Sequence, residues 1–263
     1  MEINDILNLI ETVKLENIKS VWCPSLNKDI EILPLNAEHH KMIVKSLVDS
    51  PFFSSNFNVV MYNILNSVIK NVESLNVLDK QFILLSLRSN NISNDYSLPF
   101  TTKDGTESST IVNLHDHLQS KSHIKNIDNI VHKLDENYTV EIGYPTLLSE
   151  YNFESFINKQ ITSIDQNDQK EIKNTISQLF LTNILSYVKS VTIKDSVIPF
   201  DALNMHTKLT VGLKLPSTLT QFIIDKIDQV YGKNINDVLA VEFTENGESY
   251  KEQISIDSSF FMN

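Results

Sequence analysis

The sequence predicts an α+β protein that is mostly helical and carries β-hairpins in both halves. Several long segments place apolar residues at helical spacing. Shorter alternating segments flank turn-forming pairs, Asp104-Gly105 and Asn246-Gly247. Apolar residues make up 41% of the 263 residues and charged residues 21%, which is typical of globular proteins.

The elements of the first half follow from these patterns. Apolar residues at helical spacing predict helices over residues 3–15, from 36 to the residue before Pro51, over 59–72 and over 78–89. Alternating apolar residues predict strands over residues 21–24, 30–33, 96–101, 109–114 and 138–142. The first two strands form a predicted hairpin over residues 25–28, and the next two flank Asp104-Gly105.

The second half is predicted by the same criteria. Helices are expected over residues 153–161, 172–188, 201–214 and 219–231. Strands are expected over residues 190–193, 238–243 and 250–256, with Asn246-Gly247 as the turn between the last two. The least structured boundary lies near residues 145–150, which divides the chain into 1–145 and 146–263. One compact unit is equally compatible with this length.

The helix predicted over residues 78–89 is the most distinctive segment. Its apolar residues cover almost the whole circumference, so the helix is expected to be buried. Asn76 can cap it, Asp79 falls in the first turn, and Arg88, the only arginine of the chain, falls in the last turn. Two interpretations stay open: a well-capped core helix, or an arginine selected for planar, multidentate bonding that lysine cannot provide.

Composition excludes several classes of function. The 22 basic and 33 acidic residues give a net charge of −11, which argues against nucleic acid as a partner. The first residues are acidic and no apolar run approaches the ~20 residues that span a bilayer, so we expect a soluble protein without a membrane partner. Cys23 is the only cysteine, which excludes an internal disulfide and a cysteine-based zinc site.

Catalytic patterns are sparse. The five glycines are too dispersed to form a phosphate-binding loop, and no cofactor or small-molecule substrate is expected. Asp165 and Asn167 begin a calcium-loop pattern, but Lys170 stands where that loop needs glycine. Asp165 and Asp168 are instead expected to cap the following helix.

The alternative to a non-enzymatic protein is a metal-dependent enzyme. His115 and His117 would point to one face of a predicted strand, with His123 and His132 as further ligands. The pattern is short, and Gln119 stands where common metallohydrolase motifs place another acidic or histidine ligand.

Four landmarks occur in order along the chain. They are Cys23-Pro24-Ser25 followed by residues 30–35 (IEILPL), the helix of residues 78–89 (LDKQFILLSLRS), Leu215-Pro216 at the start of a late helix, and a final hairpin that closes on Phe260-Phe261. Together they resemble the baseplate hub and hub-assembly proteins of T-even-like contractile-tailed bacteriophages. The resemblance covers nearly the whole chain.

The resemblance implies a non-enzymatic protein that contacts other phage tail or baseplate proteins, located in the virion or in the host cytoplasm during assembly. Its expected interface or structural anchors, chosen because Arg and aromatic residues dominate interface energetics, are Asp79, Arg88, Trp22, Phe260 and Phe261. Some family members carry Cys-x-x-Cys-Gly where this chain has residues 243–247 (FTENG). A zinc-stabilised hairpin is therefore excluded, and Phe243 is expected to hold the turn by packing.

Overall fold

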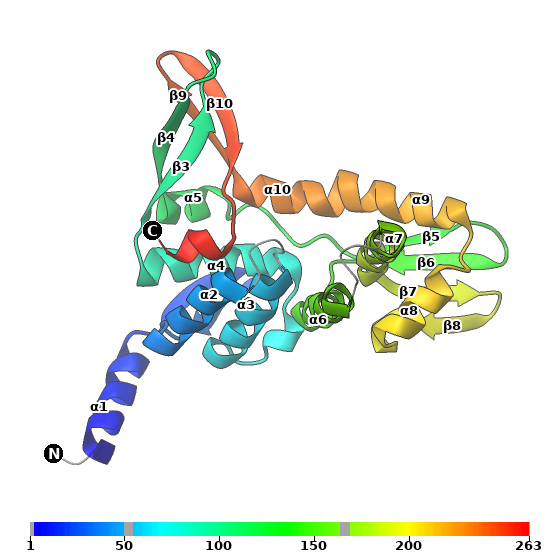
Figure 1. The fold of residues 1–263 in the computed structure, drawn as a ribbon, viewed down its shortest axis with the longest axis horizontal. Coiled ribbons are helices and arrows are strands. Elements are labelled where there is room, and N and C mark those ends of the chain that lie inside the picture. Colours follow the sequence, from blue (N-terminus) through cyan, green and yellow to red (C-terminus); the bar gives the residue numbers. More distant parts are fainter. Residues whose placement is uncertain (1–2, 50–54, 164–168, 263) are drawn as a thin grey trace.

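The computed structural model describes residues 3–49, 55–163 and 169–262. Figure 1 shows two lobes bridged by one long helical segment, α9 to α10. The N-terminal lobe carries α2 to α5 and three β-hairpins, and the sheet lobe carries β5 to β8 with α6 to α8. The C-terminal residues return to the N-terminal lobe and end beside α4.

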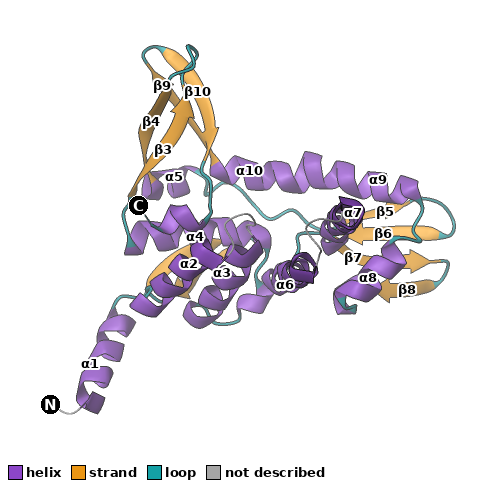
Figure 2. Cartoon of the chain, in the orientation of Figure 1, coloured by secondary structure: helices purple, strands orange, loops and turns teal. Residues whose placement is uncertain are grey.

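Helices and hairpins alternate in the N-terminal lobe, as the colouring of Figure 2 shows. Its elements are α1 (Ile3–Glu16), β1 (Lys19–Cys23), β2 (Lys28–Ile32), α2 (Ala37–Asp49), α3 (Ser55–Val68), η1 (Val72–Ser74), α4 (Val77–Asn91), β3 (Asp95–Thr101), β4 (Glu107–Asn113) and α5 (Leu114–Ser120). Most of α4 is buried. The strand β1 and the helix α5 pack directly against it, whereas α1 and the β3–β4 hairpin project from the body of the molecule in Figure 1.

Two glycines allow tight hairpin turns. Gly105 and Gly247 adopt φ values of 86° and 80°, a region that side chains with a Cβ rarely occupy. They turn the β3–β4 hairpin and the hairpin of β9 (Ala240–Glu245) and β10 (Glu248–Gln253). The rings of Phe100 and Phe243 meet edge to face at 4.9 Å, and Phe243 stacks on Tyr250 at 5.4 Å. Phe243 thus packs against two rings, and its role in holding the turn stays a prediction.

The sheet lobe contains one antiparallel sheet in the order β5-β6-β7-β8 among the described strands. Its elements are β5 (Ile130–Lys133), β6 (Tyr138–Ile142), α6 (Leu147–Ser163), α7 (Gln169–Ser186), β7 (Val188–Ile193), β8 (Ser196–Pro199), η2 (Phe200–Ala202) and α8 (Met205–Gly212). A Cβ on Gly212 would lie only 2.3 Å from Leu185 Cδ1, so the glycine lets α8 approach α7 closely.

The bridging segment consists of α9 (Ser217–Lys226), a π-helical turn (Ile227–Gly232) and α10 (Lys233–Leu239). The π turn carries Tyr231, which is fully buried and donates a hydrogen bond to the Ile142 carbonyl at 2.9 Å. The Tyr231 ring also meets Tyr144 edge to face at 4.7 Å. The Tyr231 side chain thus fixes the bridging segment to the end of β6. Single π turns within helices often occur at functional sites.

The predicted fold class is confirmed: the structure is α+β, with hairpins in both halves. Most predicted helices and strands occur close to their expected ranges. Three differences stand out. The short strands β5 and β8 were not predicted. The helix α10 covers residues 233–237, for which no element was predicted, and residues 238–239, which were expected to begin a strand. The predicted capping residues Asp165 and Asp168, and Pro51, lie outside the described residues.

The third difference concerns the alternative of a metal-dependent enzyme, because the strand that it expected at His115 and His117 is not present. Residues 115–117 belong to α5 rather than to a strand, because the Asn113 side chain caps the helix by accepting a hydrogen bond from the Asp116 amide at 3.0 Å. In a helix, residues two apart diverge by ~200°. His115 and His117 therefore do not share a face.

Candidate interaction site

Asp79 joins α4 to the first hairpin. Its carboxylate accepts hydrogen bonds from the Ser25 amide at 2.9 Å, from the Ser25 hydroxyl, and from the Asn76 amide at 2.9 Å. The Asn76 side chain in turn accepts from the Asp79 amide, which completes a capping box. Burial raises the pKa of this carboxyl, and the hydrogen bonds partly offset that effect. Asp79 fixes the position of the β1–β2 hairpin on α4.

Arg88 lies at the other end of α4 in an aromatic setting. The residue is only 2% exposed, and its guanidinium carbon lies 5.2 Å from the centre of the Tyr96 ring and 5.3 Å from that of Phe260. Its Nη1 also donates to the Ser93 carbonyl at 3.4 Å. Contacts of a cation with two ring faces are favourable, more so where water is excluded. Arg88 therefore links α4, β3 and the C-terminal segment.

The closing phenylalanines are buried within this chain. Phe260 and Phe261 are 1% and 2% exposed and belong to the short helix η4 (Ser258–Phe261). Phe260 lies 5.2 Å from Tyr96 and Phe261 lies 6.4 Å from Phe57 of α3, measured between ring centres. In this conformation the two rings hold the C-terminal segment against the N-terminal lobe.

Trp22 lies half-buried in β1 and packs against the core. Its indole Nε1 is buried and has no hydrogen-bond acceptor among the described residues. The neighbouring Cys23 is fully buried, and burial raises the pKa of its thiol well above the ordinary range. The cysteine is therefore an unreactive core residue.

A polar network between helices was not anticipated from the sequence. The ammonium group of Lys80, on α4, donates to both carboxylate oxygens of Glu150 on α6 at 2.8 Å and to the Asn58 amide oxygen on α3 at 2.9 Å. Asn58 donates to Glu154 at 2.9 Å. Lys80 sits among apolar neighbours of α4, and only the tertiary structure brings its partners together.

The histidines occupy separate environments. His117 is buried, and its Nε2 donates to the Val238 carbonyl at 2.7 Å, whereas the exposed His115 bonds Gln119 at 2.9 Å. The His132 ring stacks on Phe222 at 3.8 Å. Within the described ranges, no group of three or more His, Cys, Asp or Glu side chains is placed to hold a metal ion.

Seven of the exposed large apolar side chains among the described residues lie on α1. Its apolar residues, with exposed fractions from 43% to 75%, are Ile3, Ile6, Leu7, Leu9, Ile10, Val13 and Leu15. An amphipathic helix in a globular protein normally buries these side chains. We refer to these seven residues as the α1 apolar surface. Contiguous exposed apolar surface of this kind marks contact sites between proteins.

The last two features are the apolar character of the helices and the similarity of the chain to known proteins, which defines its family. Of the helices that the structure describes, none is long and apolar enough to span a bilayer. The sequence model of the family described as T4 bacteriophage base plate protein matches residues 16–236. No curated protein and no solved structure gives a significant match. Because the family model covers most of the sequence, including α4 with Asp79 and Arg88, the chain belongs to the T4 bacteriophage base plate protein family.

Proposed function

We propose that this protein acts by protein–protein contact at the baseplate hub, either as a hub component or as a factor for hub assembly. Its family gives it a structural role in the phage baseplate. The hub is favoured by the ordered landmarks of the sequence, above all residues 78–89. Contact is favoured by the α1 apolar surface, which is the observation that carries the proposal. This activity fits a location in the virion tail and needs no catalytic residue.

We further propose that α1 docks into an apolar groove with a basic rim on another tail protein. Helices that bind in grooves present apolar residues along one side to their partner. The charged residues of α1 are mainly acidic: Asp5, Glu11 and Glu16 against Lys14. The whole chain also carries a net charge of −11. A basic rim would complement these charges and steer the approach of the two proteins.

The first test is quantitative mass spectrometry of purified virions and of infected cells. A fixed small-integer ratio to a tail protein of known copy number would identify a hub component. Absence from virions, together with co-purification of identified tail proteins from infected cells, would identify an assembly factor. Absence from virions and from every tail intermediate would contradict both forms of the proposal.

The docking of α1 is tested separately by light scattering on the purified protein. We expect a monomer, because the proposed groove belongs to a different protein. A stable dimer that dissociates when residues 1–16 are removed would place a second copy on α1. That result would overturn the proposed partner but leave the baseplate role intact.

A further inference from the structure

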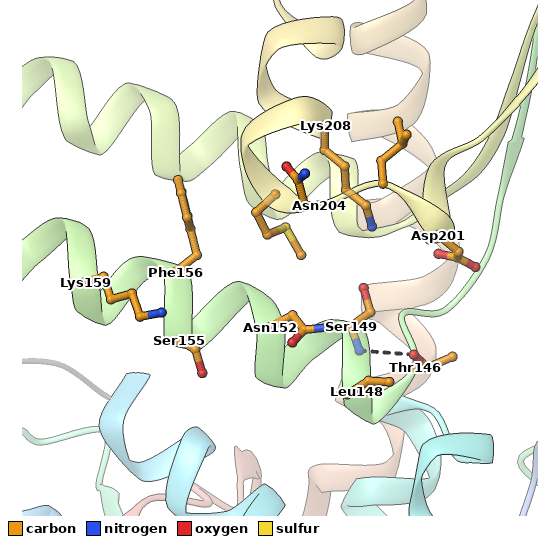
Figure 3. Close-up of a pocket in the computed structure, with 12 residues that line it drawn as sticks. Thr146, Leu148, Ser149, Asn152, Ser155, Phe156, Lys159, Asp201, Asn204 and Lys208 are labelled. Carbon is orange, nitrogen blue, oxygen red and sulfur yellow. Dashed lines mark hydrogen bonds between the residues drawn. The ribbon is translucent and has the colours of Figure 1, made fainter.

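A cavity of about 450 Å³ lies between α6 and α8 in the sheet lobe. Figure 3 shows that the start of α6, with Thr146 and Ser149, and the start of α8, with Asn204, both border it. Helix starts carry partial positive charge, because their first amide groups lack partners within the helix. Two such helix starts at one cavity favour a negatively charged ligand, but a ligand site needs more than helix ends.

A buried lysine supplies the second observation. Lys208 is only 2% exposed, and its side chain extends from α8 into the cavity toward Ser149 (Figure 3). No described residue lies within hydrogen-bond or ion-pair distance of its ammonium group. Burial lowers the pKa of Lys208, because the charged form loses contact with water. Lysine is almost never buried to this extent without a partner.

The opposite wall offers a matching donor. The Ser149 hydroxyl oxygen is buried and has no hydrogen-bond partner among the described residues, although the Ser149 amide is bonded to Thr146. Buried hydroxyl groups are normally hydrogen-bonded. The cavity is thus bordered by a lysine that is almost fully buried and by a buried hydroxyl oxygen, which come from two helices and have no hydrogen-bond partner among the described residues.

The local charge defines the ligand. The negative charge of Asp201 raises the pKa of Lys208 and so opposes the effect of burial, but Asp201 already forms an ion pair with Lys189 at 3.3 Å. Among the described residues, the Lys208 ammonium group therefore has no carboxylate within ion-pair distance, and Lys159 is a further cationic residue in the wall of the cavity. A carboxylate carries one negative charge and accepts several hydrogen bonds, whereas a phosphate dianion would add charge beside Asp201.

We propose that the cavity between α6 and α8 binds a carboxylate that pairs with the Lys208 ammonium group and accepts a hydrogen bond from the Ser149 hydroxyl. The carboxylate comes either from a free small acid or from an Asp or Glu side chain of a neighbouring protein. Both sources present the same chemical group to the site. The cavity is larger than one carboxylate, so the carbon chain that carries this group also fits inside.

The first experiment titrates the purified full-length protein with succinate at constant ionic strength, with sodium chloride as the reference, and follows the melting temperature. We expect a saturable rise, because a ligand that binds only the folded state stabilises it. Lys208→Met should abolish the rise. Lys214→Met, which removes the same charge at an exposed position just after α8, should preserve it.

The unliganded variants provide an independent readout. Lys208→Met should melt at the same temperature as the wild type or higher, because it removes a buried charge that has no ion-pair partner among the described residues. Ser149→Ala should weaken succinate binding on the order of tenfold, as expected for one hydrogen bond to a charged group. An equal succinate response in wild type and Lys208→Met, or a wild-type response that does not saturate, would overturn the proposal. The proposal would also be overturned if Lys208→Met melted at a lower temperature than the wild type and Ser149→Ala bound succinate with unchanged affinity.

A second experiment identifies the source of the carboxylate. A carbodiimide joins paired ammonium and carboxylate groups without a spacer, so purified tail assemblies are treated with it and the cross-links of Lys208 are mapped. A cross-link to an acidic residue of another protein identifies a neighbouring side chain, and saturable succinate binding with no cross-link at Lys208 identifies a free acid. A cross-link of Lys208 to Asp201 alone would overturn the proposal. The succinate titration does not depend on the baseplate role, so the two proposals can fail separately.

Discussion

At the scale of single residues, the only arginine of the chain illustrates how side-chain geometry determines the contacts of a buried residue. Arg88 faces the rings of Tyr96 and Phe260 and bonds the Ser93 carbonyl while almost fully buried. A planar guanidinium can stack on rings and donate hydrogen bonds in fixed directions at the same time, whereas an ammonium group cannot. The two interpretations of this helix are therefore compatible. The helix α4 is a capped core helix, and its Arg88 makes planar contacts that join three segments.

The substitution Arg88→Lys should lower the free energy of unfolding by about 1–3 kcal/mol, because stacking and oriented hydrogen bonds are lost in a buried site. Urea denaturation followed by circular dichroism measures this change. Lys70→Arg, an exchange of the same two residue types at an exposed position, should change stability by less than about 0.5 kcal/mol. An unchanged denaturation midpoint in Arg88→Lys would show that the aromatic setting contributes nothing specific.

His117 gives stability a defined pH dependence. Burial lowers its pKa below the ordinary value of 6.5, although the hydrogen bond to Val238 works in the opposite direction. The folded state therefore favours the neutral ring. This contribution to stability is fully present above pH 6.5 and is lost as the pH falls toward the folded-state pKa, because the unfolded chain then binds the extra proton.

We expect the fall in unfolding free energy between pH 7.5 and pH 5.5 to be smaller in His117→Gln than in the wild type. His115→Gln serves as the control, because His115 lies exposed on the same helix. The comparison between variants is needed because burial also lowers the pKa of His39 and raises that of Glu154. Equal pH dependence in wild type and His117→Gln would contradict the prediction.

At the scale of elements, α1 and α4 show two uses of apolar helical residues. The apolar residues of α4 surround the helix and are buried on every side. Those of α1 occur at similar spacing but stay exposed. Helical periodicity predicts the helix in both cases, while burial depends on what else packs there. The partner of α1 is therefore expected in another molecule, whereas the partners of α4 come from this chain.

The double substitution Ile6→Ser and Ile10→Ser should leave the unfolding free energy within about 0.5 kcal/mol of the wild type, because both side chains are exposed. It should reduce recovery of identified tail proteins from infected cells on the order of tenfold or more, as expected when contact residues are removed. Asn8→Ser on the same helix is the matched control. Unchanged recovery with the double variant would remove α1 from the proposed contact.

At the scale of the whole molecule, the end of the chain closes on its first half. The β9–β10 hairpin packs its Phe243 and Tyr250 rings against Phe100 of β3, and η4 lies beside α4. The bridging segment α9 to α10 carries the chain back from the sheet lobe (Figure 1). The expected division into 1–145 and 146–263 stays a prediction, and cooperative unfolding of both parts would favour one compact unit.

Phe260→Ala should lower the free energy of unfolding by about 3–5 kcal/mol, because the ring is 1% exposed and its removal leaves a cavity beside Tyr96 and Arg88. Thermal and urea denaturation of the isolated protein measure the effect. Met262→Ala, two residues away and 46% exposed, is the control and should have a small effect. A stable Phe260→Ala variant that loses only partner binding would instead place Phe260 at an interface.

Local signals in the sequence determined much of this structure. The helix of α4 follows from its apolar residues, the Asn76–Asp79 capping box and the charges at its two ends. The hairpins follow from alternation and from turns at Gly105 and Gly247. These signals act between neighbours in the chain, so they can be read without knowing the fold. The short strands β5 and β8 lack such signals, because each has too few residues for a clear pattern.

The tertiary structure alone decided which side chains meet. Asp79 reaches Ser25, Lys80 reaches Glu150 and Arg88 reaches Phe260 across long stretches of sequence. It also decided that the apolar residues of α1 stay exposed and that Lys208 faces a cavity. Burial and pairing depend on which elements pack together, and periodicity along one element carries no information about its neighbours. The sequence thus determined the elements and the family resemblance, whereas the packing of distant segments determined the contacts and the candidate sites.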